Sequence, residues 1–312
     1  MRILIYRDDG VVDPWARDFA AALPQAETVT WRDGQAVGPC DYAVVWAPPP
    51  QLLEQLAHVK AIFTMGAGVD ALLKLGDALP PVPIIRLGDA GMAGQMADYV
   101  AHAVLRYFRR FDEYEQQARL GIWNPLAARS KSAFTVGVLG LGQLGTPVLK
   151  TLRQLGFPVR GWSRTPKDLP GVHCYAGMAA LDEFLAGCQA LVCLLPLTPA
   201  TTNLLDRARL SRLPAGAYLI NVARGGLVAE PDLLALIRAE HIAGATLDVF
   251  RNEPLPAPHP FWSEPRITIT PHISAVTLRD EAVRQIAGKI GQLERGVPIA
   301  DIADVVERNL GY

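Results

Sequence analysis

The sequence lacks the features of secreted, metal-binding and membrane proteins. Its four cysteines form no CxxC pair and no cysteine–histidine cluster at zinc spacing, so we expect reduced thiols and no bound metal. No apolar run is long enough to span a bilayer. The first residues, MRILIYRDDG, reach acidic side chains after one short apolar run, unlike a signal peptide. We therefore expect a cytoplasmic protein.

An excess of charge of either sign is also absent. The chain carries 30 Lys and Arg against 31 Asp and Glu, a formal net charge of −1. Such a chain has no overall field that would attract it to nucleic acid or to an anionic membrane, so we expect neither as a partner. Its 312 residues are 50% hydrophobic and 20% charged, a globular composition, and they suffice for two domains.

Short apolar runs alternate with helical stretches along the whole chain, which predicts parallel sheets with helices on their faces. In the first third we predict strands in 2–6, 41–49, 58–70 and 82–87, with helices at 15–23 and 51–57. A long amphipathic helix is predicted from 92 to 121. Six more strands follow, in 134–140, 157–163, 190–196, 217–223, 244–250 and 267–271, as a doubly wound dinucleotide fold requires. The helical stretch after 275 is predicted to return to the first domain.

The string GLGQLG at 140–145 matches the dinucleotide-binding pattern, between an apolar strand and a helical stretch. Gly140 would permit the tight turn, Gly142 would let the backbone approach a pyrophosphate, and Gly145 would let helix and strand pack closely. The helix N-terminus then offers N–H groups and a partial positive charge to the phosphates. A plain glycine turn is the alternative interpretation.

The residues after the second strand of this series indicate which nicotinamide cofactor binds. NAD enzymes usually place an acid about 20 residues after the glycines. Here the strand ends in Ser163, Arg164 and Thr165, and no acid occurs before Asp168. Arginine and hydroxyl groups suit a 2′-phosphate, so we expect NADPH in preference to NADH. The alternative is that Arg164 is an ordinary surface arginine.

Three charged residues each follow a predicted strand, namely Arg224 in NVARGGLV, Glu253 in DVFRNEPL and His272 in TPHIS. With GVLGLGQLG and LLPLTPATTNLL, these blocks resemble the D-isomer-specific 2-hydroxyacid dehydrogenases over essentially the whole chain. A narrower resemblance, to the NADPH-preferring glyoxylate/hydroxypyruvate reductases, is carried by DAGMAGQMADYV, YFRRFDEY and PFWSEPRITITPHISAVT.

The resemblance implies a role for each of these residues. Arg224 would bind the substrate carboxylate and carbonyl, His272 would be the acid–base residue, and Glu253 would hydrogen-bond His272 and keep it protonated. Substrate binding is further implied for the backbone of the 65–70 loop, at Ala67, Gly68 and Val69. Trp46, at the end of a predicted strand, could form one wall of the pocket and limit substrate size, and the alternative is that it belongs to the core. Met65, Tyr99 and Trp123 are weaker candidates for that wall. The implied cofactor-binding residues are Gly140, Gly142, Gln143, Leu144, Gly145, Ser163, Arg164, Thr165, Leu195, Pro196, Ala223, Asp248 and His272, with Asp248 facing the nicotinamide carboxamide.

These residue types suit the reduction of a 2-keto acid. Negative charge develops on the ketone oxygen as hydride arrives, and histidine, which ordinarily titrates near neutral pH, can supply a proton there. A guanidinium matches a carboxylate through two parallel hydrogen bonds. We therefore expect an oxidoreductase that transfers hydride from NADPH to glyoxylate or hydroxypyruvate, giving glycolate or D-glycerate.

The predicted architecture is an α/β protein of two doubly wound parallel-sheet domains with a cleft between them. Residues 1–97 and 276–312 would form a discontinuous, flavodoxin-like substrate domain, and 98–275 a Rossmann domain for NADP. We expect a homodimer in which the 92–121 helix embraces the partner.

Three alternatives remain open from sequence alone. A non-catalytic NADP(H)-sensing or scaffold protein can share the fold, although Arg224, Glu253 and His272 together argue against it. Formate or phosphite oxidation is a second, but the formate branch typically pairs its histidine with glutamine instead of glutamate. Oxidation of larger 2-hydroxy acids is the third.

Overall fold

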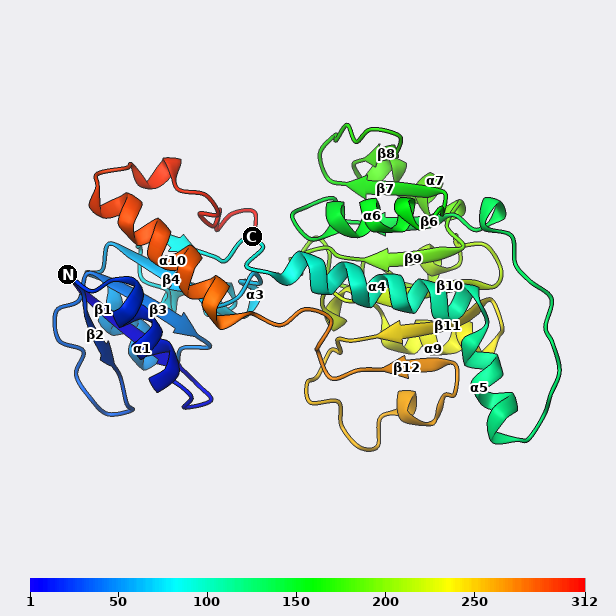
Figure 1. The fold of residues 1–312 in the computed structure, drawn as a ribbon, viewed down its shortest axis with the longest axis horizontal. Helices are drawn as coiled ribbons and strands as arrows, with labels where there is room; N and C mark the ends of the chain where they lie inside the picture. Colours follow the sequence, from blue (N-terminus) through cyan, green and yellow to red (C-terminus); the bar gives the residue numbers. More distant parts are fainter. Residues whose placement is uncertain (312) are drawn as a thin grey trace. The chain divides into compact units, whose positions relative to one another are not determined.

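The computed structural model describes residues 1–311 and contains two compact units (Figure 1). The first unit comprises Met1–Gly91 and the chain from Thr277 onward, and the second comprises Met92–Val276. Helix α4 is continuous from Met92 to Phe108, so the boundary we expected after residue 97 falls inside a helix. The division lies instead at the first residue of that helix, and the return crossing lies between 276 and 277.

The first unit contains a five-stranded parallel sheet in the order β2-β1-β3-β4-β5. This is the 2-1-3-4-5 order of flavodoxin-like folds. The strands are β1 (Arg2–Arg7), β2 (Glu27–Thr30), β3 (Tyr42–Trp46), β4 (Ala61–Thr64) and β5 (Ile84–Ile85). The helices of this unit are α1 (Asp13–Ala22), α2 (Pro50–Leu53), α3 (Asp70–Leu73) and α10 (Arg279–Glu294).

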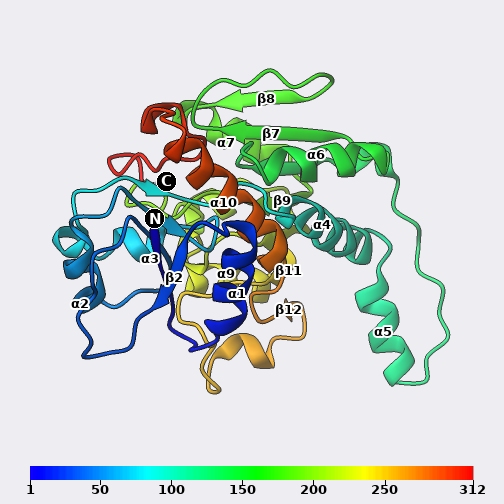
Figure 2. The ribbon, with the colours of Figure 1, turned by 60° about the vertical axis from the view of Figure 1, so that its left-hand side comes forward.

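Helix α10 brings the end of the chain back to this sheet, and it packs beside α1 (Figures 1 and 2). Its last residue, Glu294, accepts hydrogen bonds of 2.8 Å from the Tyr42 hydroxyl and from Lys60 Nζ. Beyond the helix, Val305 forms an antiparallel bridge with Ile85 of β5. The first unit is therefore built from both ends of the sequence.

The second unit contains a seven-stranded parallel sheet in the order β12-β11-β10-β9-β6-β7-β8. Counted from β6, this is the 3-2-1-4-5-6 Rossmann order with a seventh strand added at one edge. The strands are β6 (Val136–Leu139), β7 (Val159–Ser163), β8 (His173–Ala176), β9 (Ala190–Cys193), β10 (Ala217–Asn221), β11 (Ile242–Leu247) and β12 (Ile267–Ile269). The two parallel sheets confirm the predicted fold class.

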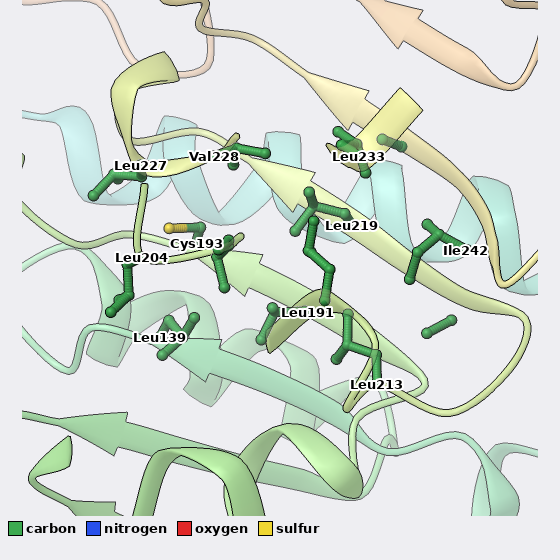
Figure 3. Packing of buried hydrophobic residues seen from close by; sticks show 14 of the residues in the cluster. Leu139, Leu191, Cys193, Leu204, Leu213, Leu219, Leu227, Val228, Leu233 and Ile242 are labelled. Atoms are coloured by element: carbon green, nitrogen blue, oxygen red, sulfur yellow. The ribbon is translucent and has the colours of Figure 1, made fainter. Parts of the chain in front are cut away.

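Alternate residues of these strands enter the two cores on either side of the sheet, as the pleat requires. One face carries Leu139, Leu191 and Leu219, which point into a leucine-rich cluster (Figure 3). The other face packs against α4 and α6. The remaining helices of this unit are α5 (Phe111–Arg119), α6 (Gly145–Gln154), α7 (Leu181–Ala186), α8 (Arg207–Leu210) and α9 (Glu230–Arg238).

The structure corrects two sequence predictions. Strands β2 and β8 were not predicted, because both are four-residue edge strands without a run of buried apolar side chains. The single helix expected over 92–121 is two helices, α4 and α5. Arg110, between them, has left-handed backbone with φ of 61°, which ends the first helix.

No helix within residues 1–311 is both long and apolar enough to cross a membrane. Over the same residues, no three histidine, cysteine or acidic side chains gather as metal ligands would.

Candidate active site

Three neighbouring strands of the second unit carry Arg224, Glu253 and His272 beyond their carboxyl ends. Arg224 follows β10, Glu253 follows β11 and His272 follows β12, and these strands are adjacent in the sheet. Parallel strands end at one edge of the sheet, and that edge is where doubly wound folds bind their ligands. The sheet order thus brings together three residues that are far apart in the sequence.

His272 and Glu253 form a direct contact, as the resemblance implied. His272 Nδ1 lies 2.8 Å from Glu253 Oε2, and the other carboxylate oxygen accepts from the Phe250 backbone N–H at 2.9 Å. The histidine side chain is 45% exposed. With Nδ1 held by the carboxylate, the Nε2 atom lies on the opposite side of the ring, where it can face a substrate.

The loop that carries His272 is fixed by the carboxylate of Asp248. This side chain is fully buried and accepts from Thr270 Oγ1 at 2.5 Å and from the N–H groups of Ile273 and Ser274 at 2.8 Å each. The His272 N–H also donates to the Asp248 backbone carbonyl. Three protein donors therefore hold the Asp248 carboxylate and fix the loop beyond β12.

The Arg224 loop is shaped by Asn221, the last residue of β10, which is almost completely buried. Its amide donates to the Arg224 carbonyl at 3.0 Å and its side-chain oxygen accepts from the Ala223 N–H at 3.2 Å. A short 3₁₀ helix, Gly225–Leu227, follows. A Cβ at Gly225 would lie 1.9 Å from the Phe250 carbonyl carbon, so the arginine loop lies directly against the loop that carries Glu253.

The glycine loop after β6 leaves room for a ligand only at its middle glycine. Gly140 has φ of +106°, and a Cβ there would lie 2.7 Å from the Leu194 carbonyl oxygen. A Cβ at Gly145 would lie 1.8 Å from the Gly140 carbonyl oxygen, so helix α6 begins in contact with the loop. No atom lies within 4 Å of the equivalent position at Gly142. This open backbone, followed by a helix N-terminus, fits a dinucleotide pyrophosphate.

The loop after β7 holds the residues expected to select the cofactor. Ser163 is buried, and its hydroxyl donates to the Thr165 carbonyl at 2.7 Å, so this serine orders the loop. Arg164 and Thr165 are exposed. At the same edge of the sheet, Leu195 and Pro196 follow β9, where the Pro196 carbonyl accepts from Thr201. Leu195 and Ala223 are both largely buried.

The first unit holds the expected substrate loop at the carboxyl end of β4. The Trp46 ring covers this loop, since a Cβ at Gly66 would lie 2.4 Å from it. Within the described residues, the N–H groups of 66–69 have no protein acceptor, whereas the carbonyl of Gly66 accepts from Thr64 Oγ1 and Leu87 N–H. The loop thus offers unpaired donors next to an aromatic wall.

The other wall candidates differ in their surroundings. Met65 is buried, Trp123 is 96% exposed, and the Tyr99 hydroxyl bonds Thr270. Sequence reasoning missed Asn221 and Thr270, because one neutral polar residue at a strand end gives no pattern of its own. Only their position, three residues before Arg224 and two before His272, distinguishes them.

Residues 101–274 match the model of the D-isomer specific 2-hydroxyacid dehydrogenase, NAD binding domain. The chain belongs to the D-isomer-specific 2-hydroxyacid dehydrogenase family. A glyoxylate/hydroxypyruvate reductase A of Yersinia enterocolitica is 46% identical over 311 residues, which cover 98% of this chain and 99% of that protein. The family resemblance predicted from the sequence blocks is thereby confirmed.

Two solved structures share the fold over the full chain. A D-isomer specific 2-hydroxyacid dehydrogenase from Xanthobacter autotrophicus Py2, in complex with NADPH and MES, has a TM-score of 0.94 at 40% identity and covers 100% of this chain and 99% of its own. An NADPH-dependent glyoxylate/hydroxypyruvate reductase from Sinorhizobium meliloti, in complex with NADP and sulfate, has a TM-score of 0.93 at 32% identity with the same coverage.

Proposed function

We propose that this dehydrogenase reduces the small 2-keto acids glyoxylate and hydroxypyruvate with NADPH. The observation that carries the proposal is the His272–Glu253 pair, whose loop lies in backbone contact with the loop of Arg224. A proton donor and a carboxylate-binding guanidinium are what the reduction of a 2-keto acid requires. The full-length similarity to a glyoxylate/hydroxypyruvate reductase A supports the choice of substrate.

NADPH is the cofactor that the described residues fit. Gly140, Gly142 and Gly145, with Gln143 and Leu144, would hold the pyrophosphate at the start of α6, and Arg164 with Thr165 would hold the 2′-phosphate. Leu195, Pro196 and Ala223 would contact the nicotinamide half, with Asp248 facing its carboxamide. When bound, NADPH supplies the hydride that adds to the keto carbon. Two neighbouring structures that contain NADPH or NADP support this choice.

The side chains would divide the remaining chemistry between them. Arg224 would bind the carboxylate through two parallel hydrogen bonds and thereby orient the ketone. As the carbonyl oxygen gains negative charge, His272 would give it the Nε2 proton, and Glu253 would stabilise the imidazolium before that transfer. In the first unit, Ala67, Gly68 and Val69 are the proposed substrate-binding residues, with unpaired backbone N–H groups beside the ring of Trp46.

A homodimer is proposed from the surface of α5 and the loop after it. None of the α5 residues is buried within the chain. Phe111, Leu120, Ile122 and Trp123 are between 47% and 96% exposed, and they lie close together in the sequence. A cluster of large apolar side chains in that position is typical of a subunit interface.

The experiment that tests the function is NADPH oxidation at 340 nm with a panel of 2-keto acids. We expect turnover with glyoxylate and hydroxypyruvate and slower turnover with keto acids that carry larger side chains. Faster turnover of the larger acids would favour the third alternative above. Formate or phosphite oxidation with NADP⁺ would favour the second, and tight NADPH binding without any turnover would favour a sensing protein.

A further inference from the structure

Helix α4 reaches the loop of His272 through one tyrosine. The Tyr99 hydroxyl lies 2.6 Å from Thr270 Oγ1, and Thr270 Oγ1 donates to Asp248 Oδ1 at 2.5 Å. The Asp248 carboxylate in turn accepts from the N–H groups of Ile273 and Ser274. These contacts connect a helix on one face of the sheet to both residues that follow His272.

The chemistry of the three side chains decides which group donates in each of these hydrogen bonds. A carboxylate accepts hydrogen bonds and donates none, so the Thr270 proton must point to Asp248. The Thr270 oxygen is then free only to accept, and Tyr99 must be the donor. Burial raises the pKa of the Tyr99 hydroxyl to about 12, so its proton is retained at any pH at which the enzyme is assayed.

His272 needs this external support because its backbone is strained. Its φ is +56°, in the left-handed region that only a few per cent of non-glycine residues adopt, histidine more often than most. Such a residue keeps its conformation only when its surroundings impose it. Here they are the bond from the His272 N–H to the Asp248 carbonyl and the bonds from the next two residues to the Asp248 carboxylate.

We propose that Tyr99 is a positioning residue for catalysis, which fixes the His272 imidazole through Thr270 and Asp248 without touching the substrate. Loss of its hydroxyl removes one of the two hydrogen bonds that hold the Thr270 side chain and lets the 270–274 loop shift. Small displacements of a reacting group lower the rate of a chemical step far more than they alter ground-state binding. This inference rests on the proposed reductase activity.

The test is the single-turnover rate of NADPH oxidation by glyoxylate in Tyr99→Phe, beside the NADPH Kd and the Tm. We expect the rate to fall about threefold to tenfold, as for the loss of one hydrogen bond, with the Kd within about twofold of wild type. Thr270→Val should lower the rate at least as much. Because both residues act through one chain of bonds, the double variant should be no slower than Thr270→Val alone. Thr270→Ser, which keeps the hydroxyl, should restore the wild-type rate.

The matched control is Tyr107→Phe on the same helix. The Tyr107 hydroxyl donates to the Gly216 carbonyl at 2.8 Å, at the amino end of β10 and so at the opposite edge of the sheet from His272. This variant should lower the Tm as Tyr99→Phe does and leave the single-turnover rate unchanged. If the wild-type enzyme is active and Tyr99→Phe has the same single-turnover rate, the inference is overturned. Additive losses of rate in the double variant would also overturn it. An inactive wild-type enzyme would instead overturn the proposed function.

Discussion

His272 combines a reactive side chain with a left-handed backbone, and the choice of replacement matters for that reason. Alanine would lose the proton donor and also fit the backbone poorly, whereas asparagine adopts this region most readily after glycine. We expect His272→Asn to lower kcat by about 10²- to 10⁴-fold, the range for loss of acid–base catalysis, with the NADPH Kd and the Tm close to wild type. Steady-state kinetics and thermal melts check this. Wild-type turnover would remove His272 from the mechanism.

Arg224 is the second residue whose geometry can be tested directly. Lysine keeps the positive charge but cannot form the paired hydrogen bonds of a guanidinium, and it would lose the bond from Arg224 Nη1 to the Ala223 carbonyl. We therefore expect Arg224→Lys to raise KM for glyoxylate by at least about tenfold and to lower kcat as well, because the ketone is then misoriented. A KM close to the wild-type value would contradict the proposed carboxylate contact.

Among the structural elements, the loop after β7 carries the prediction about the cofactor. Arg164→Ala should weaken kcat/KM for NADPH by about tenfold to a hundredfold, the value of a charged hydrogen bond, and leave NADH almost unaffected. Lys167→Ala, a second basic side chain in the same loop, is the control and should have a smaller effect. The measurement is kcat/KM for both cofactors at one ionic strength. Equal weakening of both cofactors would mean that Arg164 makes no phosphate contact.

Ser163, the last residue of β7, is a poor position for a substitution meant to change the preference for NADPH over NADH. Its hydroxyl donates to the Thr165 carbonyl. A carboxylate in its place would face that carbonyl oxygen and distort the loop, and any loss of NADPH binding would then have two causes. Arg164, whose side chain is exposed, gives the cleaner comparison.

Helix α10 is anchored to the first sheet through the carboxylate of Glu294. Hydrogen bonds from Lys60 and Tyr42 lower the pKa of Glu294 from its ordinary value near 4.5. A lowered pKa in the folded state stabilises the protein above the unfolded value, and this contribution is lost as the pH falls through the folded value. We expect Glu294→Gln to reduce the Tm by about 1–3 °C at pH 7, as for a partly exposed ion pair, and to have a smaller effect at acidic pH, where the carboxylate becomes protonated.

The control for this prediction lies on the same helix. Glu281 pairs with Arg284 within α10 and does not reach the sheet through that pair. Glu281→Gln should therefore leave the Tm almost unchanged at both pH values. A Tm difference for Glu294→Gln that persists at the acidic end would show that the carboxylate charge is not what anchors the helix.

The elements that sequence predicted well are those with apolar runs buried on both faces. Strands such as β9 and β10 are entirely buried, so each of their residues is apolar or sits at the strand end. The edge strands β2 and β8 are four residues long and only partly buried, so neither contributes a continuous buried apolar run. The helix break at Arg110 depends on backbone geometry and leaves no pattern in hydrophobicity.

The residues of the candidate site also differ in how far the sequence alone predicts them. Arg224, Glu253 and His272 are charged residues in glycine- or proline-bounded loops, and they are conspicuous in sequence. The residues that hold them depend on contacts between segments far apart in the chain. Tyr99 meets Thr270 across 171 positions, and that pairing exists only once α4 has packed on the sheet.

At the scale of the whole molecule, the proposed homodimer gives the last prediction. Light scattering at micromolar concentration should report twice the chain mass of 33.8 kDa. Replacing Leu120 and Trp123 together by serine should favour the monomer, since exposed apolar side chains stabilise an interface by about 25 cal/mol per Å² buried. Trp262→Ser is the control, because Trp262 is also exposed but lies outside α5 and its loop. A monomeric wild-type protein would reject the proposal.

The construction of the first unit from both ends of the sequence has a consequence for how the protein is made. A ribosome adds about 5–20 residues per second, and domains generally fold as units when their residues emerge. The sheet of the first unit is synthesised first, but α10, which packs beside α1, is synthesised last. The second unit is contiguous in the chain and is complete before α10 exists. The unit that begins the polypeptide is therefore the later of the two to finish folding, and during elongation its α1 face is the surface that a chaperone would have to protect.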